Sequence, residues 1–331
     1  MERYLTLSRI KKMKLIYILL LSIITSNVMS QSVPARNENI PYLVTFGADG
    51  DKSWGDDDFC QVFFFVVPKT HKKAMYIRVY DPGTSGKIDE KKGEFNSKTK
   101  FSIYGGKGCI SNSKARQTNP VTGYDSGNLL ASKTFTNEYD DKWYSFGPIN
   151  PSSGELSEQY GGYVIKLIIK GISGDDGNLY KLFLSTSPDK NQEVEGGNAF
   201  TFEYTFRLNN DPVQVSHVYP YIDSKVVSVK QNNYDWDVDG DLKIISNTRL
   251  GIHLKKSGNG NWGRSEHKVL SKEKESSFDV QFHKNKSNPV NNNNIAFNIT
   301  NQYGEAMPFY TIPIGGVPKP KSTIKLIPGG K

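Results

Sequence analysis

Hydrophobic side chains recur at every second position along most of this chain, and that period constrains the fold more than any other feature. Successive side chains of a β-strand point to opposite faces of a sheet, so short runs of this kind, bounded by Gly, Pro, Asp and Asn, predict strands. The clearest runs are Gln61–Val67, Ala74–Tyr80, Tyr163–Lys170 and Leu179–Leu184. Later runs are Val213–Val218, Lys225–Val229, Leu242–Ile245, Phe278–Phe282, Ile295–Ile299 and Phe309–Ile314. No long stretch has the 3.6-residue period of an α-helix, so the sequence predicts an all-β fold.

Turn-forming residues divide these strands into two groups. The segment Asn209–Pro212 is rich in turn residues and precedes a new set of strands, so we predict two consecutive antiparallel β-sandwich domains. Gly174–Asn178, between two strong strand patterns, predicts a hairpin. The expected divisions are an N-terminal linker at 31–39, a sandwich with a long loop insertion at 40–208, an immunoglobulin-like sandwich at 209–317 and a basic flexible tail at 318–331. The insertion is the irregular segment from Gly105 to Ser157.

Residues 1–30 are typical of a secretory signal peptide. A basic segment precedes the apolar run Leu15–Thr25, whose length of about 11 residues suits a signal-peptide core and is too short to span a bilayer. Val28 and Ser30 fit a cleavage site after residue 30. We therefore expect an exported protein, secreted or at the cell surface, with no stable transmembrane segment after cleavage. The alternative is an uncleaved membrane anchor.

Charge does not point to a nucleic-acid partner. The formal net charge of +8 falls to +4 without residues 1–30, which hold five basic residues and one acid. The remaining basic residues do not gather with aromatic residues on any one segment, as a nucleic-acid interface requires. We expect no nucleic-acid binding.

The two cysteines, Cys60 and Cys109, both fall in the first predicted domain. Export permits a disulfide, and closing the loop between them would stabilise the domain by about 3–4 kcal/mol. We predict this bridge, with two buried thiols as the alternative.

The strongest local pattern is the segment DWDVDGD. Its carboxylates alternate along the chain: Asp235, Asp237, Asp239 and Asp241. Gly240 permits a sharp turn, and the pattern is similar to the first half of a D-x-D-x-D-G calcium loop. Ser246 stands where an EF-hand has its bidentate Glu, and the flanks predict strands, so an EF-hand is excluded. A β-domain calcium loop and a plain acidic turn both stay open.

A second set of acids lies in loops of the first predicted domain: Asp56, Asp57, Asp58, Asp81 and Asp89. Loops of a sandwich gather at its ends, so acids that are separated in the sequence can converge there. A divalent cation would relieve the repulsion among closely packed carboxylates. The alternative is that these acids are solvated and only keep the surface polar.

The run IRVYDPGTSGKIDE resembles the strand and acidic loop of C2-type calcium domains. The runs DDDFCQVFFFVVP and YVIKLIIKGISGDDGNLYKLFLS resemble the opening and closing strands of pre-peptidase C-terminal (PPC-like) domains. The resemblance implies a small, secreted, non-catalytic sandwich that is often calcium-dependent. It also implies that the five acids of the preceding paragraph are the positions for a metal. The second unit resembles immunoglobulin-like or fibronectin-like domains only generically.

Tryptophans in polar, Gly-rich segments point to a second kind of site. Trp262 follows the segment SGNGN, and a loop Trp there could stack on a sugar ring while Arg264 supplies hydrogen bonds. Trp54 is a further candidate of the same type. The alternative is that the Trp262 side chain folds back to cover the edge of the sandwich.

Catalysis finds little support in the sequence. The five histidines are scattered without paired spacing, and no G-x-S-x-G motif is present. The favoured interpretation is therefore a non-catalytic extracellular or cell-surface binding or structural module, stabilised by calcium, with an extracellular protein or a glycan as partner. A carbohydrate-binding protein that uses the loop tryptophans, and a hydrolase with an unrecognised site, are the alternatives.

Overall fold

The computed structural model describes residues 31–118 and 123–319. The predicted signal peptide and most of the predicted tail lie outside these residues. Within them, every regular element is a β-strand or a short 3-10 turn, which confirms the predicted all-β fold. None of the helical turns described is long and apolar enough to cross a membrane.

The largest sheet has nine strands, and the strand pairs in it are antiparallel. Its path is β18 (Trp262–Lys268), β15 (Ser228–Tyr234), β21 (Asn294–Asn301), β12 (Glu203–Arg207), β2 (Tyr42–Phe46), β10 (Gly177–Ser185), β4 (Met75–Tyr80) and β7 (Trp143–Ile149). The ninth strand, β1 (Ser32–Val33), pairs with β10 beside β2.

Three smaller sheets and five 3-10 turns complete the described fold. The seven-stranded sheet has the order β22 (Phe309–Tyr310), β11 (Asn198–Thr201), β3 (Cys60–Pro68), β9 (Gly162–Ser173), β5 (Lys98–Gly105) and β6 (Asn128–Phe135), with β8 (Glu155–Ser157) on β9. The four-stranded sheet has the order β13 (Ser216–Val218), β20 (Asp279–His283), β16 (Asp241–Ile245) and β17 (Ile252–His253), and β14 (Tyr221–Ile222) pairs with β19 (Ser276–Ser277). The 3-10 turns are η1 (Arg36–Glu38), η2 (Lys52–Trp54), η3 (Ser113–Arg116), η4 (Pro151–Ser153) and η5 (Ser271–Glu273).

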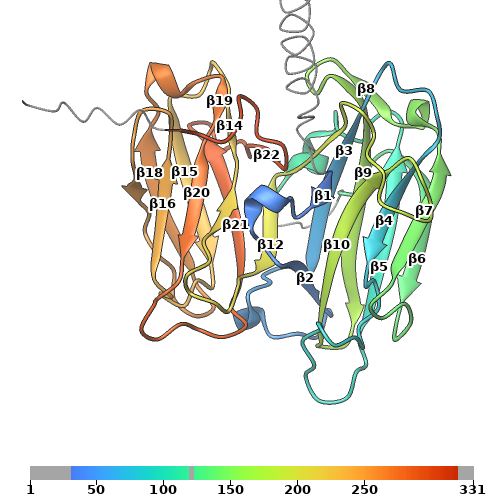
Figure 1. The fold of residues 1–331 in the computed structure, drawn as a ribbon, viewed down its shortest axis with the longest axis horizontal. Coiled ribbons are helices and arrows are strands. Elements are labelled where there is room, and N and C mark those ends of the chain that lie inside the picture. The colour runs from blue at the N-terminus through green and yellow to red at the C-terminus, as the bar shows by residue number, and fades with distance from the viewer. Residues whose placement is uncertain (1–30, 119–122, 320–331) are drawn as a thin grey trace, which may run out of the picture. The chain divides into compact units, whose positions relative to one another are not determined.

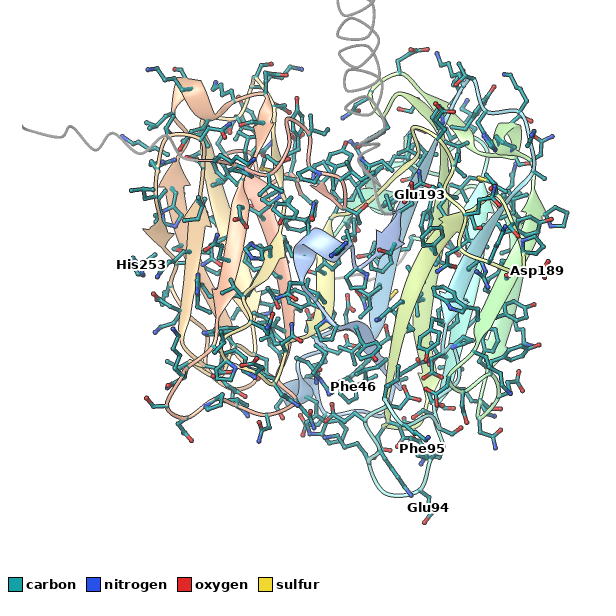
Figure 2. The ribbon with its side chains drawn as sticks, viewed as in Figure 1. Phe46, Glu94, Phe95, Asp189, Glu193 and His253 are labelled. Carbon is teal, nitrogen blue, oxygen red and sulfur yellow. The ribbon has the colours of Figure 1, made fainter. Side chains whose placement is uncertain are left out.

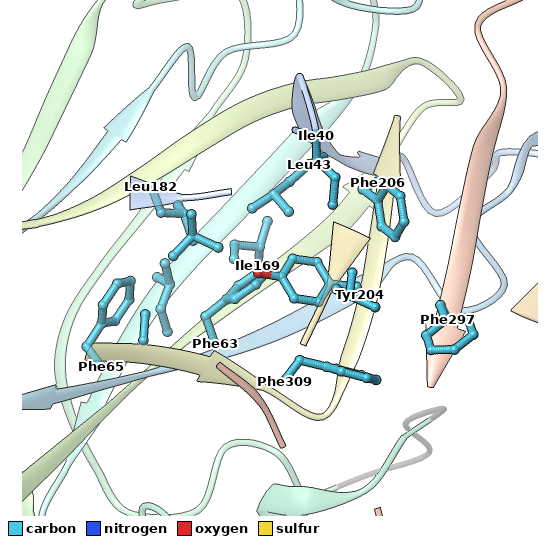
Figure 3. Close-up of a cluster of buried hydrophobic side chains, with 14 of the residues drawn as sticks. Ile40, Leu43, Phe63, Phe65, Ile169, Leu182, Tyr204, Phe206, Phe297 and Phe309 are labelled. Atoms are coloured by element: carbon cyan, nitrogen blue, oxygen red, sulfur yellow. The ribbon is translucent and has the colours of Figure 1, made fainter. Parts of the chain in front are cut away.

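Strand β3 is buried on both faces, and this explains why its apolar run has almost no polar residues. Phe63 and Phe65 belong to the main core, whereas Phe64 lies in a separate cluster on the other face, stacked on Phe200 with ring centroids 5.1 Å apart. A strand that is covered on both faces reads as a continuous hydrophobic run. The main core around Phe63 and Phe65 is shown in Figure 3.

Strand β12 joins the two halves of the chain. It lies before residue 209, yet it pairs with β2 of the first half on one side and with β21 of the second half on the other. Figure 1 shows β12 and β2 between the blue-to-green strands and the orange strands. Tyr204 and Phe206 of β12 share one core cluster with residues of both halves. The two-domain division near residue 209 stays a prediction; the structure shows that its two parts share this sheet and this core.

Two local predictions about the first half were wrong. The segment from Gly105 to Ser157 is not one irregular insertion, because it contains β6, β7 and β8. Strand β6 lies at a sheet edge and most of its side chains are not buried, so it carries no alternating apolar pattern to detect. The turn Gly174–Asp176 connects two correctly predicted strands, but β9 and β10 lie in different sheets. The turn therefore crosses between sheets and does not close a hairpin.

The predicted disulfide is also absent, since Cys60 and Cys109 are both free and buried. The Cys109 thiol donates to the carbonyl oxygen of Val164 at 3.6 Å, whereas Cys60 pairs with Lys170 on the same strand β9. Six residues of β-strand separate those two contacts by about 20 Å. A disulfide needs Cα atoms within about 7 Å. The alternative interpretation, two buried thiols, is the one that the structure supports.

Candidate metal centre

The loop between β2 and β3 carries three consecutive acids, Asp56, Asp57 and Asp58, which we call the aspartate triplet. Gly55 precedes it with a φ of 94°. A Cβ atom at Gly55 would stand 2.5 Å from the carbonyl oxygen of Asn294 on β21. Glycine avoids both the strain of that φ and this clash. The loop can therefore pass close to β21 and turn into β3.

Backbone N–H groups fix two of the three carboxylates. Asp56 accepts hydrogen bonds from the N–H of Phe46 at 2.8 Å through Oδ2 and from the N–H of Phe59 at 2.9 Å through Oδ1. Asp58 Oδ1 accepts from the N–H of Cys60 at 2.9 Å. Phe46 is labelled in Figure 2 and marks this end of β2. The loop conformation is thus held by the acids themselves.

Asp57 is the unusual member of the aspartate triplet. Asp57 is only 5% exposed, yet no other described residue donates a hydrogen bond to either of its carboxylate oxygens, and Oδ2 of Asp58 has no hydrogen-bond partner. One carboxylate oxygen from each of the three residues lies within 4.8 Å of the others. Buried polar atoms in folded proteins are almost always paired, so three unpaired anionic oxygens in one place require an explanation.

The electrostatic consequence is that all three carboxyl groups have raised pKa values. Burial is the main cause that raises the pKa of Asp56 to about 7 and that of Asp57 to about 6. Burial, followed by the negative charge of Glu203, raises the pKa of Asp58 well above its usual range. A cation bound beside these carboxylates would offset the free-energy cost of burying their charge.

The spacing of the aspartate triplet suits a single calcium ion. Calcium binds six to eight oxygen ligands at about 2.4 Å, so two of its ligands can be at most about 4.8 Å apart. The three carboxylates meet that limit. Asp57 and Asp58 would supply their unpaired oxygens, and Asp56 would add an oxygen whose second lone pair is still open. Water would supply the remaining ligands.

Asp176 shows how a buried acid is normally accommodated in this fold. It is fully buried, and it accepts hydrogen bonds from the N–H groups of Lys92 at 2.8 Å and Asn96 at 2.9 Å, and from the hydroxyl of Ser97 at 3.0 Å. Donors from one loop thus surround its carboxylate. The contrast with Asp57 indicates that burial of an acid alone does not produce unpaired oxygens here.

Asp81 and Asp89 lie in the loop that follows β4. Asp89 accepts from the N–H of Leu179 at 2.7 Å and from that of Gly86 at 2.9 Å, while Asp81 accepts from the N–H of Asp141 at 3.1 Å. Oδ2 of Asp81 is buried without a partner. Burial raises the pKa of Asp81 to about 7 and that of Asp89 to about 8. These two predicted residues do come together, at a place separate from the aspartate triplet.

The acids of the DWDVDGD segment do not share one partner. Asp235 accepts from the N–H of Gly260, Asp239 forms an ion pair with Lys284 at 3.5 Å, and Asp241 binds His253 at 3.1 Å. Asp237 has none of these contacts, and burial raises its pKa. The segment holds a tight turn with positive φ at Asp235, Asp237 and Val238. These contacts favour the acidic turn over the calcium loop.

The predicted tryptophan sites lie on neighbouring segments, since a Cβ atom at Gly260 would stand 3.3 Å from Cβ of Ser53. Trp54 packs against Phe46 with ring centroids 5.6 Å apart, and its carbonyl oxygen accepts a hydrogen bond from Asn294. Trp262 begins β18 and packs against Tyr234 with ring centroids 5.1 Å apart. Both indoles are partly buried against other rings, whereas Arg264 is exposed. This arrangement is closer to a Trp folded back on the sandwich than to an open stacking platform.

Sequence reasoning missed three residues that lie near the predicted acids. Glu203 of β12 acts on Asp58 through its charge. Asp140 and Asn178 lie beside the loop that holds Asp81 and Asp89. Each comes from a distant segment, and only the strand pairing places it there, so no local pattern could have identified it.

Comparison of the chain with known protein families found no match, and comparison with curated proteins found none either.

Proposed function

We propose that this chain is an exported, non-catalytic β-sandwich module that is stabilised by calcium at the aspartate triplet. The observation that carries the proposal is the Asp57 carboxylate, which is buried beside Asp56 and Asp58 and receives no hydrogen bond from any other described residue. Calcium is a hard cation that prefers carboxylate oxygens, and it would add positive charge to that of Lys52, which already acts on Asp57.

The location of the aspartate triplet supports a stabilising role for the ion. The triplet lies in the loop that leads into β3, next to the close contact between Gly55 and β21. Glu203, on the strand that joins the two halves, acts on Asp58 through its charge. An ion at this point would fix the loop and, through it, the junction of the shared sheet. The module would then present its surface to an extracellular protein or a glycan.

The test is the melting temperature of the protein in calcium and in a chelator. A bound ligand stabilises the folded state by RT ln(1 + [L]/Kd), about 2.7 kcal/mol when calcium is at 100 times Kd. We expect calcium to raise the melting temperature of the wild type and to have a much smaller effect on Asp57→Asn. Asn keeps the shape of the side chain and removes its charge.

Glu94→Gln is the matched control. Glu94 is an exposed acid at the tip of a loop in Figure 2, so the loss of its charge should leave the calcium effect unchanged. If the wild type shows no calcium-dependent shift, or if Asp57→Asn responds as the wild type does, the proposed site is wrong.

A further inference from the structure

A buried amine and a buried amide meet at one carboxylate oxygen in the second half of the chain. Lys284 follows β20, Asn293 precedes β21, and Asp239 lies in the turn between β15 and β16. Nζ of Lys284 lies 3.5 Å from Oδ2 of Asp239, and Nδ2 of Asn293 donates to the same oxygen at 3.2 Å. The two ends of the loop between β20 and β21 therefore share one acidic partner.

The protein encloses this group of three side chains. Lys284, Asn293 and Asp239 are only 4%, 3% and 2% exposed. Nδ2 of Asn293 also donates to the carbonyl oxygen of Trp236 at 3.2 Å, and the fully buried Trp236 ring packs against Phe282 with ring centroids 6.0 Å apart. Lysine is almost never buried to this extent in folded proteins unless it is paired, so the state of this amine requires an explanation.

The surroundings of Lys284 favour an uncharged amine. Its Nζ donates to the carbonyl oxygen of Val290. The 3.5 Å separation from Asp239 exceeds the length of about 2.7–2.9 Å that a charge-assisted hydrogen bond has. Burial is the main cause that lowers the pKa of Lys284; the charge of Asp239 opposes this shift, whereas that of Arg207 adds to it. A lysine with a lowered pKa is a better nucleophile, because the uncharged amine is the form that attacks.

The carboxylate of Asp239 is held in place by the start of the same loop. Its Oδ1 accepts a hydrogen bond from the N–H of Asn285 at 3.2 Å. A Cβ atom at Gly240 would stand 2.1 Å from the carbonyl oxygen of His283, so only glycine lets the turn pack this closely against the end of β20. Oδ1 of Asp239 is thus fixed by the backbone, and Oδ2 remains for the amine and the amide.

We propose that Lys284 and Asn293 are joined by an intramolecular isopeptide bond, with Asp239 as the acid and base that moves the proton. The Nζ–Cγ bond forms as the Cγ–Nδ2 bond of Asn293 breaks. One proton passes from Nζ through the Asp239 carboxyl group to the leaving nitrogen, which departs as ammonia. An amine and an amide give a new amide and ammonia, so the reaction requires no oxidant, reductant or cofactor. The fold supplies the proximity that makes such a step fast.

The fold also selects one asparagine among neighbours. Asn293 belongs to a run of four asparagines at 291–294. The first two are exposed, and Oδ1 of Asn294 accepts a hydrogen bond from Nε of Arg207 at 2.6 Å. Among these four, only Asn293 donates to Asp239 in the described structure. The isopeptide bond should therefore form at the third asparagine of the run.

The bond would connect two sheets of the second half. Strand β20 belongs to the four-stranded sheet and β21 to the nine-stranded sheet. The link would close the loop between them with an amide that reductants do not open, in a chain whose two cysteines are free. It does not involve the aspartate triplet, so it can be tested independently of calcium.

The experiment is peptide mapping of the purified full chain by mass spectrometry after trypsin digestion. Trypsin does not cut after an acylated lysine. The peptide that ends at Lys286 should therefore be uncut at Lys284 and joined to the peptide that begins at Ser287, with a mass one ammonia below their sum. Fragmentation should place the link at Asn293. Separate peptides of full mass would overturn the proposal, and so would a link from Lys284 to the peptide that contains Asp239.

Four variants test the roles of the individual side chains. Lys284→Arg and Asn293→Ser each remove one reacting group and should abolish the link. Asp239→Asn keeps both reacting groups and should leave them unlinked. Lys256→Arg is the matched control, because this exposed lysine donates to the carbonyl oxygen of Gly240 at 2.7 Å in the same turn, and it should keep the link. Circular dichroism establishes that each variant is folded, and a folded Asp239→Asn that is fully linked would overturn the role of Asp239.

Discussion

Arg207 of β12 and Glu90 of the loop after β4 form an ion pair at the junction of the two halves. Asn294 of β21 donates to the same Glu90 oxygen at 3.2 Å and accepts from Nε of Arg207 at 2.6 Å. The other oxygen of Glu90 pairs with Lys92 at 2.7 Å, and the Lys92 ammonium lies 4.1 Å from the centroid of the Trp54 ring. One mostly buried carboxylate thus connects the shared strand, the second half and the loop that leads to the aspartate triplet.

Neutralising that carboxylate should destabilise the whole described fold. Breaking a buried ion pair costs about 3–5 kcal/mol of stability. Because the Glu90 side chain is 17% exposed, we expect the loss of this pair to cost an amount near or below the lower end of that range. We expect Glu90→Gln to lower the free energy of unfolding by about 2–3 kcal/mol in urea denaturation. Glu94→Gln, on the same loop but exposed, should change it by less than about 0.5 kcal/mol. Equal effects of the two substitutions would show that the junction does not depend on this pair.

Glu38 should make stability depend on pH. It is fully buried in η1, and burial raises its pKa from 4.5 to about 8, despite hydrogen bonds from the N–H of Ala35 and the hydroxyl of Tyr204. Between these two pKa values the folded state binds more protons than the unfolded state. Its contribution to stability is therefore complete below about pH 4.5 and is lost as the pH rises through 8.

The measurement is the free energy of unfolding against pH in the presence of a chelator. The wild type should lose stability between pH 5 and 8, with Glu38 contributing up to about 1.4 kcal/mol per pH unit. Glu38→Gln should have a shallower slope, and Glu94→Gln should keep the wild-type slope. A Glu38→Gln profile that is parallel to the wild type would mean that Glu38 is ionised in the folded protein at neutral pH.

Two glycines with similar backbone angles should respond differently to alanine. Gly55 and Gly93 have φ values of 94° and 82°, so Ala is strained at both. A Cβ atom at Gly55 would also meet the carbonyl oxygen of Asn294 at 2.5 Å, whereas Gly93 has no atom within 4 Å of that position. We expect Gly93→Ala to lower the free energy of unfolding by about 1 kcal/mol, which is the cost of the left-handed backbone alone. Gly55→Ala should lower the free energy of unfolding by clearly more than Gly93→Ala does, and it should also weaken calcium binding at the aspartate triplet. Similar unfolding midpoints for the two variants would argue against the close approach of the loop to β21.

The strands that are buried on at least one face could be predicted from the sequence, because burial imposes alternation or a continuous apolar run. β3, β9 and β10 were found in this way. β6 was not, because it lies at a sheet edge where exposed positions accept polar residues. The sequence also predicts acidic loops at Asp57, Asp81 and Asp89, because acids that follow or precede strand patterns are visible in it. Their unpaired oxygens were not visible, because hydrogen-bond donors come from the rest of the fold.

By itself, the order of residues determined the all-β class and the places where acids gather in loops, since both depend on neighbours within a few positions of one another. Only the tertiary structure decided which strands pair, that the turn at Gly174 crosses between sheets, and that Cys60 and Cys109 stay apart. It also decided that Asp140 and Asn178 join Asp81, because contacts between distant segments depend on sheet order and register. Those are properties of the folded chain as a whole, and many registers are compatible with the same alternating pattern.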